Sequence, residues 1–336
     1  MKKWTSRDIP SQRGRSAIVT GTGGLGFETA LALARAGAHV VIAGRNPEKG
    51  AEAVAAIRET VPGARVRFGR VDLADLASIA EFASRIAQEH ESVELLVNNA
   101  GVMRMPHRRE TSDGFERQFG TNYLGHFALT MHLLPLLRRG NKPRVVTVGS
   151  IAARWGAMNF DNLHAERGYK PMQAYSQSKL ACLMFAFELN RRSEAVGWDI
   201  ESLAAHPGIS RTDLIPNGPG WSSMPGFARR YLWFLYQPAW QGALPILFAA
   251  TGPAARSGAY YGPDQLGGTR GYPIEEKPPG QALETAVAAR LWEISLELVD
   301  MKKPLARPRA LIAPEPARQV WPALAPECSP AERSQE

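Results

Sequence analysis

The chain has 336 residues, of which 44% are hydrophobic and 21% charged, and its formal net charge is +8. These values are ordinary for a folded globular protein, and the length suits one large α/β domain with appended ends. The basic residues are scattered and do not alternate with aromatic residues, which argues against a nucleic-acid partner. Two cysteines, Cys182 and Cys328, indicate neither a disulfide framework nor a metal site, so we expect a cytoplasmic protein. No apolar run is long enough to predict a membrane span.

A strand, a glycine turn and a helix open the predicted domain. The apolar run 16–20 ends in Gly21-Thr22-Gly23-Gly24-Leu25-Gly26, and a stretch rich in Ala and Leu follows. Glycines let the backbone turn tightly and approach a phosphate, while the helix start offers free N–H groups and a positive dipole end. Because a second strand is predicted at 39–43, this unit favours a dinucleotide site over a plain turn.

The residues after the second strand predict which dinucleotide binds. NAD sites usually place Asp or Glu here, about 20 residues beyond the glycines. This chain instead has Arg45 and Asn46. Arg45 can pair with a 2′-phosphate and no carboxylate opposes it, so we expect NADP(H) in preference to NAD(H). The alternative is a solvated loop arginine without a ligand.

Strand and helix patterns alternate along the rest of the chain. This order predicts a single doubly wound, Rossmann-type parallel sheet with helices on both faces. Strands are expected at 65–71, 93–97, 145–148, 200–204 and 258–263, and helices at 27–36, 47–60, 76–89, 114–139, 172–196, 237–250 and 283–299. Ligands of such sheets bind at the carboxyl ends of the strands. Five residues that follow strands are therefore expected at the cofactor, namely Asp72, Leu73, Asn99, Ala100 and Gly101.

A tyrosine and a lysine lie one turn apart on the predicted helix 172–196. Tyr175 and Lys179 would place a phenol and an ammonium on one helix face. An ordinary phenol stays protonated near neutral pH, and a neighbouring cation favours loss of its proton. Such a pair is common by chance, so its meaning depends on its neighbours. Cys182 belongs to the apolar stripe of this helix and is predicted to be a core residue, not a nucleophile.

With these motifs in order, the chain resembles the short-chain dehydrogenase/reductase family over about 14–261. The resemblance rests on the glycine turn, on the segments 98–101 and 206–212, and on the set Asn122, Ser150, Tyr175 and Lys179. It implies that this set is catalytic. Ser150 would hold the substrate oxygen, Tyr175 would act as acid/base, Lys179 would also bind the nicotinamide ribose, and Asn122 would hold a water that connects Lys179 to solvent. A turn-forming Ser and an Asn at a helix kink are the structural alternatives.

The resemblance also extends to the cofactor loop and to one branch of the family. Four residues, Pro207, Gly208, Ile209 and Thr212, would lie on the nicotinamide side. The segments 43–50, 121–127 and 174–180 are similar to retinol-dehydrogenase-like oxidoreductases, which implies NADP(H) and lipophilic alcohols or carbonyl compounds. One departure is a glycine turn that is one residue short, although Gly21, Gly23 and Gly26 keep the general G-x-G-x-x-G spacing. The departure leaves open which amide meets which phosphate.

The ends of the chain and one insertion complete the predicted organisation. We expect an N-terminal extension at 1–13, the oxidoreductase domain at 14–300 and a Pro-rich tail at 301–336. An insertion rich in aromatic residues at about 213–240 would form a lid over the substrate. Two alternatives are packing against the core or a partner subunit of a homo-oligomer, and weak peripheral contact with a membrane surface.

Taken together, the motifs predict an NADP(H)-dependent oxidoreductase that interconverts a lipophilic or aromatic alcohol and its ketone or aldehyde. Two alternatives stay open. One is a reductase of conjugated C=C bonds on the same fold, and the other is a non-catalytic NADP(H)-sensing or scaffold protein. The complete set of Ser150, Tyr175 and Lys179 argues against the second alternative.

Overall fold

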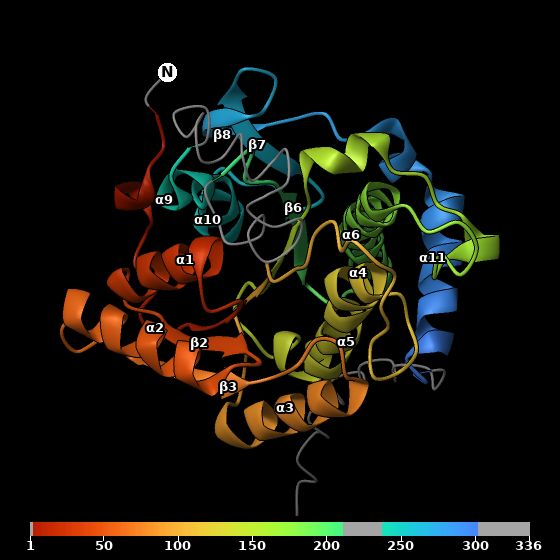
Figure 1. Cartoon of the computed structure of the whole chain (residues 1–336). Helices are drawn as coiled ribbons and strands as arrows, with labels where there is room; N and C mark the ends of the chain where they lie inside the picture. Colours follow the sequence, from red (N-terminus) through yellow and green to blue (C-terminus); the bar gives the residue numbers. More distant parts are fainter. Residues whose placement is uncertain (1–2, 211–236, 302–336) are drawn as a thin grey trace, which may run out of the picture. The chain divides into compact units, whose positions relative to one another are not determined.

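The computed structural model describes residues 3–210 and 237–301, which fold around one eight-stranded sheet (Figure 1). Its strand order is β3-β2-β1-β4-β5-β6-β7-β8. The first seven strands are parallel, and β8 runs antiparallel to β7. The strands are β1 Ser16–Thr20, β2 His39–Gly44, β3 Val66–Arg70, β4 Leu95–Asn98, β5 Arg144–Val148, β6 Glu201–Ala205, β7 Tyr260–Gln265 and β8 Arg270–Glu275. The predicted doubly wound α/β fold is therefore confirmed.

Helices cover both faces of the sheet (Figure 1). One layer holds α1 Gly24–Arg35, α2 Pro47–Thr60, α9 Ala239–Gly242 and α10 Leu244–Thr251. The other layer holds α3 Leu76–Glu89, α4 Arg117–Phe119, α5 Gly125–Leu137, α6 Pro171–Val196 and α11 Thr285–Leu298. A π-helical turn, Gly120–Leu124, joins α4 to α5, and short 3-10 turns include Ile151–Trp155 after β5.

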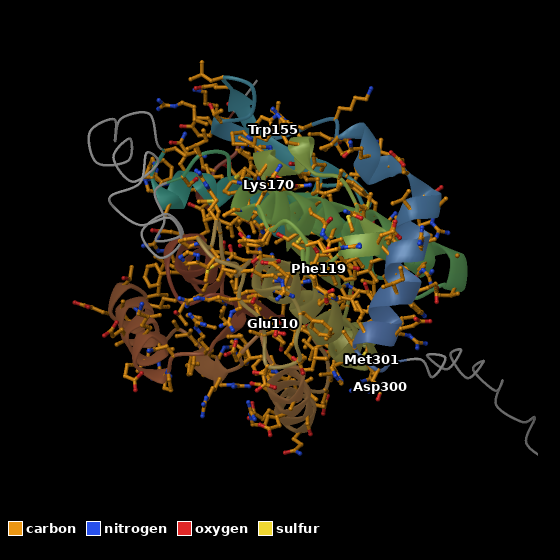
Figure 2. All side chains as sticks on the ribbon, turned by 45° about the vertical axis from the view of Figure 1, so that its right-hand side comes forward. Glu110, Phe119, Trp155, Lys170, Asp300 and Met301 are labelled. Atoms are coloured by element: carbon orange, nitrogen blue, oxygen red, sulfur yellow. The ribbon has the colours of Figure 1, made fainter. Side chains whose placement is uncertain are left out.

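Alternating side chains of the strands feed two separate apolar cores. Ile18 and Leu96 pack with α3, α5, α6 and α11, whereas Val19 and Val97 pack with α1 and α10. Successive residues of a strand point to opposite faces, so a strand buried on both sides is apolar throughout. Phe119 lies fully buried in the first core (Figure 2). The unbroken apolar runs of the sequence reflect this double burial.

The structure corrects three of the predicted elements. Strand β8 was not predicted, and the sheet is therefore not entirely parallel. The helix expected over 114–139 begins only at Arg117, because Glu116 bridges to Glu110 and its carboxylate caps the helix start. The helix expected over 237–250 is two helices, α9 and α10, and Gln237 instead bridges to Ser210. These differences depend on contacts between distant segments.

The predicted N-terminal extension packs against the domain. The ring of Trp4 meets Phe248 of α10 edge to face, with ring centroids 5.3 Å apart, and Gln12 is buried. The Pro-rich tail 302–336 and the predicted lid up to residue 236 lie outside the described residues, so their roles stay predictions. Within the parts that are described, no helix is long and apolar enough to cross a membrane.

Candidate active site

The glycine turn after β1 closes tightly on itself and leaves amides free. Gly21 and Gly24 have φ of 101° and 52°, which favours glycine. A Cβ at Gly26 would lie 2.3 Å from the carbonyl oxygen of Gly21, so no side chain fits there. Among the described residues, no acceptor meets the amides of 22–25 at the start of α1. This cradle fits a pyrophosphate despite the shortened turn.

The end of β2 lies beside this turn. A Cβ at Gly44 would lie 2.9 Å from the methyl group of Thr22, which places Thr22 directly over the strand end. The next residue, Arg45, is exposed and pairs with no carboxylate of the described chain. Asn46 is the N-cap of α2, where its Oδ1 accepts a hydrogen bond from Lys49 N at 2.7 Å. Arg45 is therefore available to a ligand, whereas a structural role accounts for Asn46.

The turns after β3 and β4 complete the cofactor edge. Asp72 holds its own turn, since its Oδ1 accepts from Ala74 N at 3.0 Å, and Leu73 is buried against the start of α5. Asn99 ties its turn to β1 by donating from Nδ2 to the carbonyl oxygen of Thr20 at 2.7 Å. The amides of Asn99 and Ala100 both donate to Thr20 Oγ1, at 2.8 and 2.9 Å. These residues position the edge through backbone contacts.

Tyr175 and Lys179 are both buried on α6, but they differ in the hydrogen bonds of their side chains. Tyr175 is only 4% exposed, and its hydroxyl makes no hydrogen bond with any residue described here. Lys179 is 5% exposed, and its Nζ donates to the carbonyl oxygen of Val148 at 2.8 Å. That contact anchors the ammonium at the end of β5, two residues before Ser150. The phenol therefore stays available while the cation beside it is held.

Ser150 has a hydrogen left to donate. It caps the 3-10 turn Ile151–Trp155, where its Oγ accepts from Ala152 N at 3.2 Å. Glycines on either side let this segment approach α6 closely. A Cβ at Gly149 would lie 2.7 Å from the side chain of Leu183, and one at Gly156 would lie 2.5 Å from the carbonyl oxygen of Ser176. The predicted Ser150 and Tyr175 thus lie on two segments in direct contact.

Asn122 lies in the π-helical turn, and both the oxygen and the nitrogen of its side-chain amide are hydrogen-bonded. Its Oδ1 accepts from Val102 N at 2.7 Å, and its Nδ2 donates to Val102 O at 2.9 Å and to Ser178 Oγ at 3.0 Å. A Cβ at Gly101 would lie 3.0 Å from Asn122 Oδ1 and 3.8 Å from Lys179 Nζ, so Gly101 lies close to both side chains. The amide of Asn122 therefore locks the 101–102 loop, and its water-holding role stays a prediction.

Cys182 has the surroundings of a core residue. It is 2% exposed, and burial raises the pKa of its thiol although Lys179 opposes the shift. Its Sγ donates to the main-chain carbonyl of Asn122 at 3.2 Å. A buried thiol with a raised pKa is a poor nucleophile at neutral pH.

The loop after β6 is held by residues that the sequence did not reveal. Gly208 has φ of 63°, and a Cβ there would lie 2.3 Å from the carbonyl oxygen of Thr269. The amide of Ile209 donates to the same oxygen at 2.7 Å. Gln237, which is buried, donates from Nε2 to Pro207 O at 2.6 Å. Thr212 lies outside the described residues.

A clasp of three side chains, His206, Glu276 and Arg154, fastens this loop to the β7–β8 hairpin and to the turn after Ser150. His206 Nε2 lies 3.1 Å from Glu276 Oε1, and Arg154 Nη2 lies 3.2 Å from Glu276 Oε2. The amide of Gly208 donates to His206 Nδ1 at 3.2 Å, so the ring hydrogen is on Nε2. Burial opposes ionisation of Glu276, but His206 and Arg154 outweigh it and lower the pKa of this carboxyl. Glu276 and Arg154 were missed because no local spacing links them.

The combination of this sheet, a glycine turn with free amides and a buried Tyr and Lys beside a strand-end Ser defines a nicotinamide-dinucleotide-dependent oxidoreductase. Residues 15–219 match the family model for short chain dehydrogenases. The chain therefore belongs to the short-chain dehydrogenase/reductase family, in its retinol-dehydrogenase-like branch. Enzymes of this family act on CH–OH and C=O groups.

Relatives match most of the chain. A polyprenol dehydrogenase from Mus musculus is 41% identical over 297 residues, which cover 86% of this chain and 85% of the relative. Retinol dehydrogenase 13 from the same organism is 40% identical over 294 residues, covering 86% and 84%. The crystal structure of a protein from Mycobacterium Paratuberculosis matches with a TM-score of 0.74 and 38% identity, over 90% of this chain and 100% of that one.

Proposed function

We propose that the protein is an NADP(H)-dependent oxidoreductase that interconverts a lipophilic or aromatic alcohol and its ketone or aldehyde, with Tyr175 as acid/base. The observation that carries the proposal is the hydroxyl of Tyr175. Tyr175 is 4% exposed, its hydroxyl has no partner in the described chain, and it lies one helical turn from the anchored ammonium of Lys179. A hydroxyl that no described protein group occupies is available to a substrate oxygen, which favours a ligand as its partner.

The residues of the site would divide the proton chemistry between them. When bound, the nicotinamide supplies the hydride for carbonyl reduction or accepts it in alcohol oxidation. In reduction, Tyr175 gives its proton to the carbonyl oxygen, and in oxidation it takes that proton back from the alcohol. Ser150 donates a hydrogen bond to the same oxygen and holds it in place. The charge of Lys179 stabilises the phenolate between these events.

Two exposed apolar side chains support a lipophilic substrate. Trp155 is 70% exposed and Leu266 is 73% exposed. Trp155 ends the turn that follows Ser150 and lies at the surface (Figure 2). Arg154 Nη1 donates to the carbonyl oxygen of Gly267 at 3.1 Å, which joins the segments that carry these two side chains. The relatives named polyprenol dehydrogenase and retinol dehydrogenase 13 favour the same substrate class.

The first test replaces the proposed acid/base. Tyr175→Phe removes the group assigned to transfer the proton to and from the substrate oxygen, so kcat should fall by about 10²–10⁴ while NADPH still binds. Tyr123→Phe is the matched control, because Tyr123 is a buried tyrosine whose hydroxyl is already paired with Ser295 Oγ at 2.6 Å. It should retain turnover. Activity is measured by NADPH oxidation across retinoid, steroid, aromatic and terpenoid carbonyls, with the reverse alcohol screen beside it.

Product analysis in the same screen separates the alternatives. An unsaturated carbonyl reduced to the allylic alcohol supports the proposal, whereas a saturated ketone would identify a C=C reductase. NADPH binding without any turnover would favour a sensing or scaffold role. Retained activity in Tyr175→Phe would remove the proposed mechanism.

The preference for NADP(H) rests on Arg45. Its guanidinium is exposed at the end of β2, beside the turn where Thr22 covers Gly44. A charge-assisted hydrogen bond to a 2′-phosphate is worth about 1.5–3 kcal/mol, so Arg45→Ala should lower the preference for NADP(H) by about 10–100-fold. The ratio of KM for the two cofactors measures this. Arg65→Ala is a control on the opposite edge of the sheet, and an unchanged ratio in Arg45→Ala would contradict the proposal.

A further inference from the structure

A chain of buried hydrogen bonds joins the cofactor turn to Asn122 through His126. His126 is 2% exposed and lies on α5, just after the π-helical turn. Its Nε2 lies 2.9 Å from Thr20 Oγ1, at the end of β1. Its Nδ1 lies 2.9 Å from the main-chain carbonyl oxygen of Asn122. One imidazole therefore touches both the strand that carries the glycine turn and the turn that carries Asn122.

The partners determine which ring nitrogen carries the hydrogen. A carbonyl oxygen only accepts, so Nδ1 must donate to Asn122. At the other end, Thr20 Oγ1 already accepts the amides of Asn99 and Ala100, which occupy its two lone pairs. Only the hydrogen of Thr20 is then left for bonding, and Nε2 at 2.9 Å is a closer acceptor for it than the carbonyl oxygen of Val97 at 3.3 Å. Both ends fit the same neutral tautomer.

The electrostatic surroundings agree with this neutral form. Burial lowers the pKa of His126 to about 4, and the charge of Lys179 acts in the same direction, while the hydrogen bond to Asn122 opposes them. The other titratable neighbour at the Asn122 carbonyl is the Cys182 thiol, whose pKa burial raises. No change of charge is therefore expected at His126 near neutral pH.

The contact matters because Asn122 sits where the helix departs from α-helical bonding. Gly125 N donates to Gly120 O, five residues back, as a π-helical turn requires. The carbonyl of Asn122 accepts two side-chain donors, Nδ1 of His126 and Sγ of Cys182. A thiol is a weak donor, so the imidazole is the stronger of the two contacts. Loss of the imidazole would leave the carbonyl with the weaker thiol as its side-chain donor, while the amide stays bonded to Val102.

We propose that His126 is a positioning residue that holds the Asn122 carbonyl in the π-helical turn and couples it, through Thr20, to the two turns that bind the cofactor. This inference rests on the proposed function. The hydroxyl of Thr20 joins the turns after β1 and β4, and His126 extends that junction to the turn of Asn122. A shift of Asn122 would move the loop at Gly101 and Val102, which it holds and which lies beside the ammonium of Lys179.

Two substitutions test the contacts of the two ring nitrogens of His126 separately. In His126→Asn, the amide nitrogen takes the place of Nδ1 and can still donate to Asn122, while Thr20 can turn its hydrogen to Val97 O at 3.3 Å. In His126→Gln, the longer side chain reaches Thr20 instead and leaves the Asn122 carbonyl to Cys182. We expect kcat to fall about tenfold in His126→Gln with the Kd for NADPH within about twofold of wild type, and to stay near wild type in His126→Asn. Equal losses in both variants, or no loss in either, would overturn the proposal.

Thr130→Val provides a control for stability alone. Thr130 lies one turn further along α5, is fully buried, and bonds to His126 O at 2.7 Å and to Asn98 Nδ2 at 3.0 Å. Its loss should lower Tm as much as the His126 substitutions but leave kcat unchanged. Hydrogen exchange of the amides in 120–125 should quicken in His126→Gln and not in Thr130→Val.

Two readouts do not depend on turnover. In ¹⁵N-histidine-labelled enzyme, the signals of His126 are those that disappear in His126→Gln. In the wild type these signals should have the chemical shifts of the Nδ1–H tautomer, and the shifts should stay constant from about pH 5 to 8. An Nε2–H tautomer, titration within that range, or unchanged exchange in 120–125 would refute the positioning role even if no substrate is found. Absence of turnover in the wild type would instead remove only the proposed function.

Discussion

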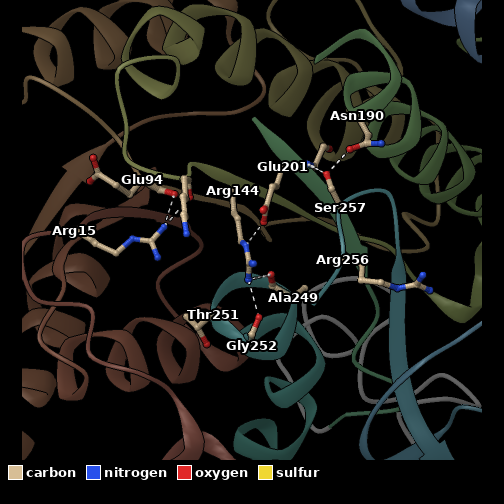
Figure 3. Close-up of polar contacts among 12 residues, drawn as sticks. Arg15, Glu94, Arg144, Asn190, Glu201, Ala249, Thr251, Gly252, Arg256 and Ser257 are labelled. Carbon is tan, nitrogen blue, oxygen red and sulfur yellow. Dashed lines mark hydrogen bonds and ion pairs between the residues drawn. The ribbon is translucent and has the colours of Figure 1, made fainter. Parts of the chain in front are cut away.

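The two edges of the sheet use polar groups in opposite ways. At the amino edge, Arg144 pairs with Glu201 and donates to the carbonyl oxygens of Ala249 and Gly252 at 3.3 and 3.0 Å (Figure 3). At the carboxyl edge, the amides of 22–25 and the hydroxyl of Tyr175 have no partner in the described chain. Arg144 is thus hydrogen-bonded within the protein at the amino edge, whereas these amides and this hydroxyl at the carboxyl edge are available to a ligand.

Helix direction explains the contrast. In a parallel sheet with crossover helices, the C-termini of the helices reach the amino edge and expose carbonyl oxygens, which attract arginines. The N-termini reach the carboxyl edge and expose N–H groups, which attract anions. A hollow of about 800 Å³ lies at the amino edge, lined by Arg15, Arg144 and Glu201 among others.

Among the substitutions that compare the two edges, the largest effect is expected from closing the cofactor cradle. In Gly26→Ala the new Cβ would lie 2.3 Å from Gly21 O, which forces the turn open. The Kd for NADPH should rise about 100-fold, in line with an overpacking cost of roughly 1–3 kcal/mol. Isothermal titration of NADPH into the folded variant measures this.

Gly140→Ala is the matching substitution at the amino edge. Its Cβ would lie 2.6 Å from Val93 O, so this substitution overpacks the backbone as Gly26→Ala does and should lower Tm. The Kd for NADPH should not change, because no ligand contact is assigned to that edge. A weakened affinity in Gly140→Ala would show that the two edges are coupled and that the contrast between them is incomplete.

A second prediction concerns the ion pair of the amino edge. Arg144→Met leaves Glu201 and two helix-terminal carbonyls without their donor, so the free energy of unfolding should fall by about 2 kcal/mol. Glu201 is 36% exposed at its side chain, which keeps the cost below that of a fully buried pair. Chemical denaturation measures the loss. The value of kcat/KM should stay at the wild-type level, and a fall in it at a temperature where the variant is folded would contradict the separation of roles.

Much of the carboxyl edge was predictable because its signals are local. The glycine turn, Arg45 and the pair Tyr175 and Lys179 each lie within one element, where spacing in sequence determines spacing in space. The two cores also follow from apolar runs, since a strand buried on both faces has no polar alternation. The same reasoning predicted where β1 to β7 lie along the chain, with ends shifted by one or two residues.

Contacts between distant segments were not predictable. Strand β8 packs antiparallel on β7, and its sequence Arg270–Glu275 contains a Gly and a Pro that obscure any strand pattern. Glu276 is 70 residues from His206 and 122 from Arg154, so no periodicity links them. The bonding of His126 was hidden for the same reason, because Thr20 is 106 residues away.

The smallest predicted effect concerns the clasp of His206, Glu276 and Arg154. Glu276→Gln keeps the shape of the side chain but removes its charge, which weakens both contacts. The loop 207–209 is bonded to the β7–β8 hairpin through Thr269, so we expect only partial loosening. The free energy of unfolding at pH 7 should fall by about 1 kcal/mol, since Arg154 is partly exposed and solvent screens its ion pair. A rise in KM for NADPH of about two- to fivefold should accompany it.

The pH dependence of that loss distinguishes charge from shape. The pKa of Glu276 is lowered in the folded protein from its ordinary value of 4.5, so its stabilising contribution is present above that value. The contribution is lost as the pH falls through the lowered pKa, because the wild-type carboxyl then becomes protonated. The stability difference between wild type and Glu276→Gln should therefore be constant from about pH 6 to 8 and shrink below about pH 4.5. Denaturation at several pH values measures it, and a difference that persists at low pH would show that the clasp acts through packing rather than charge.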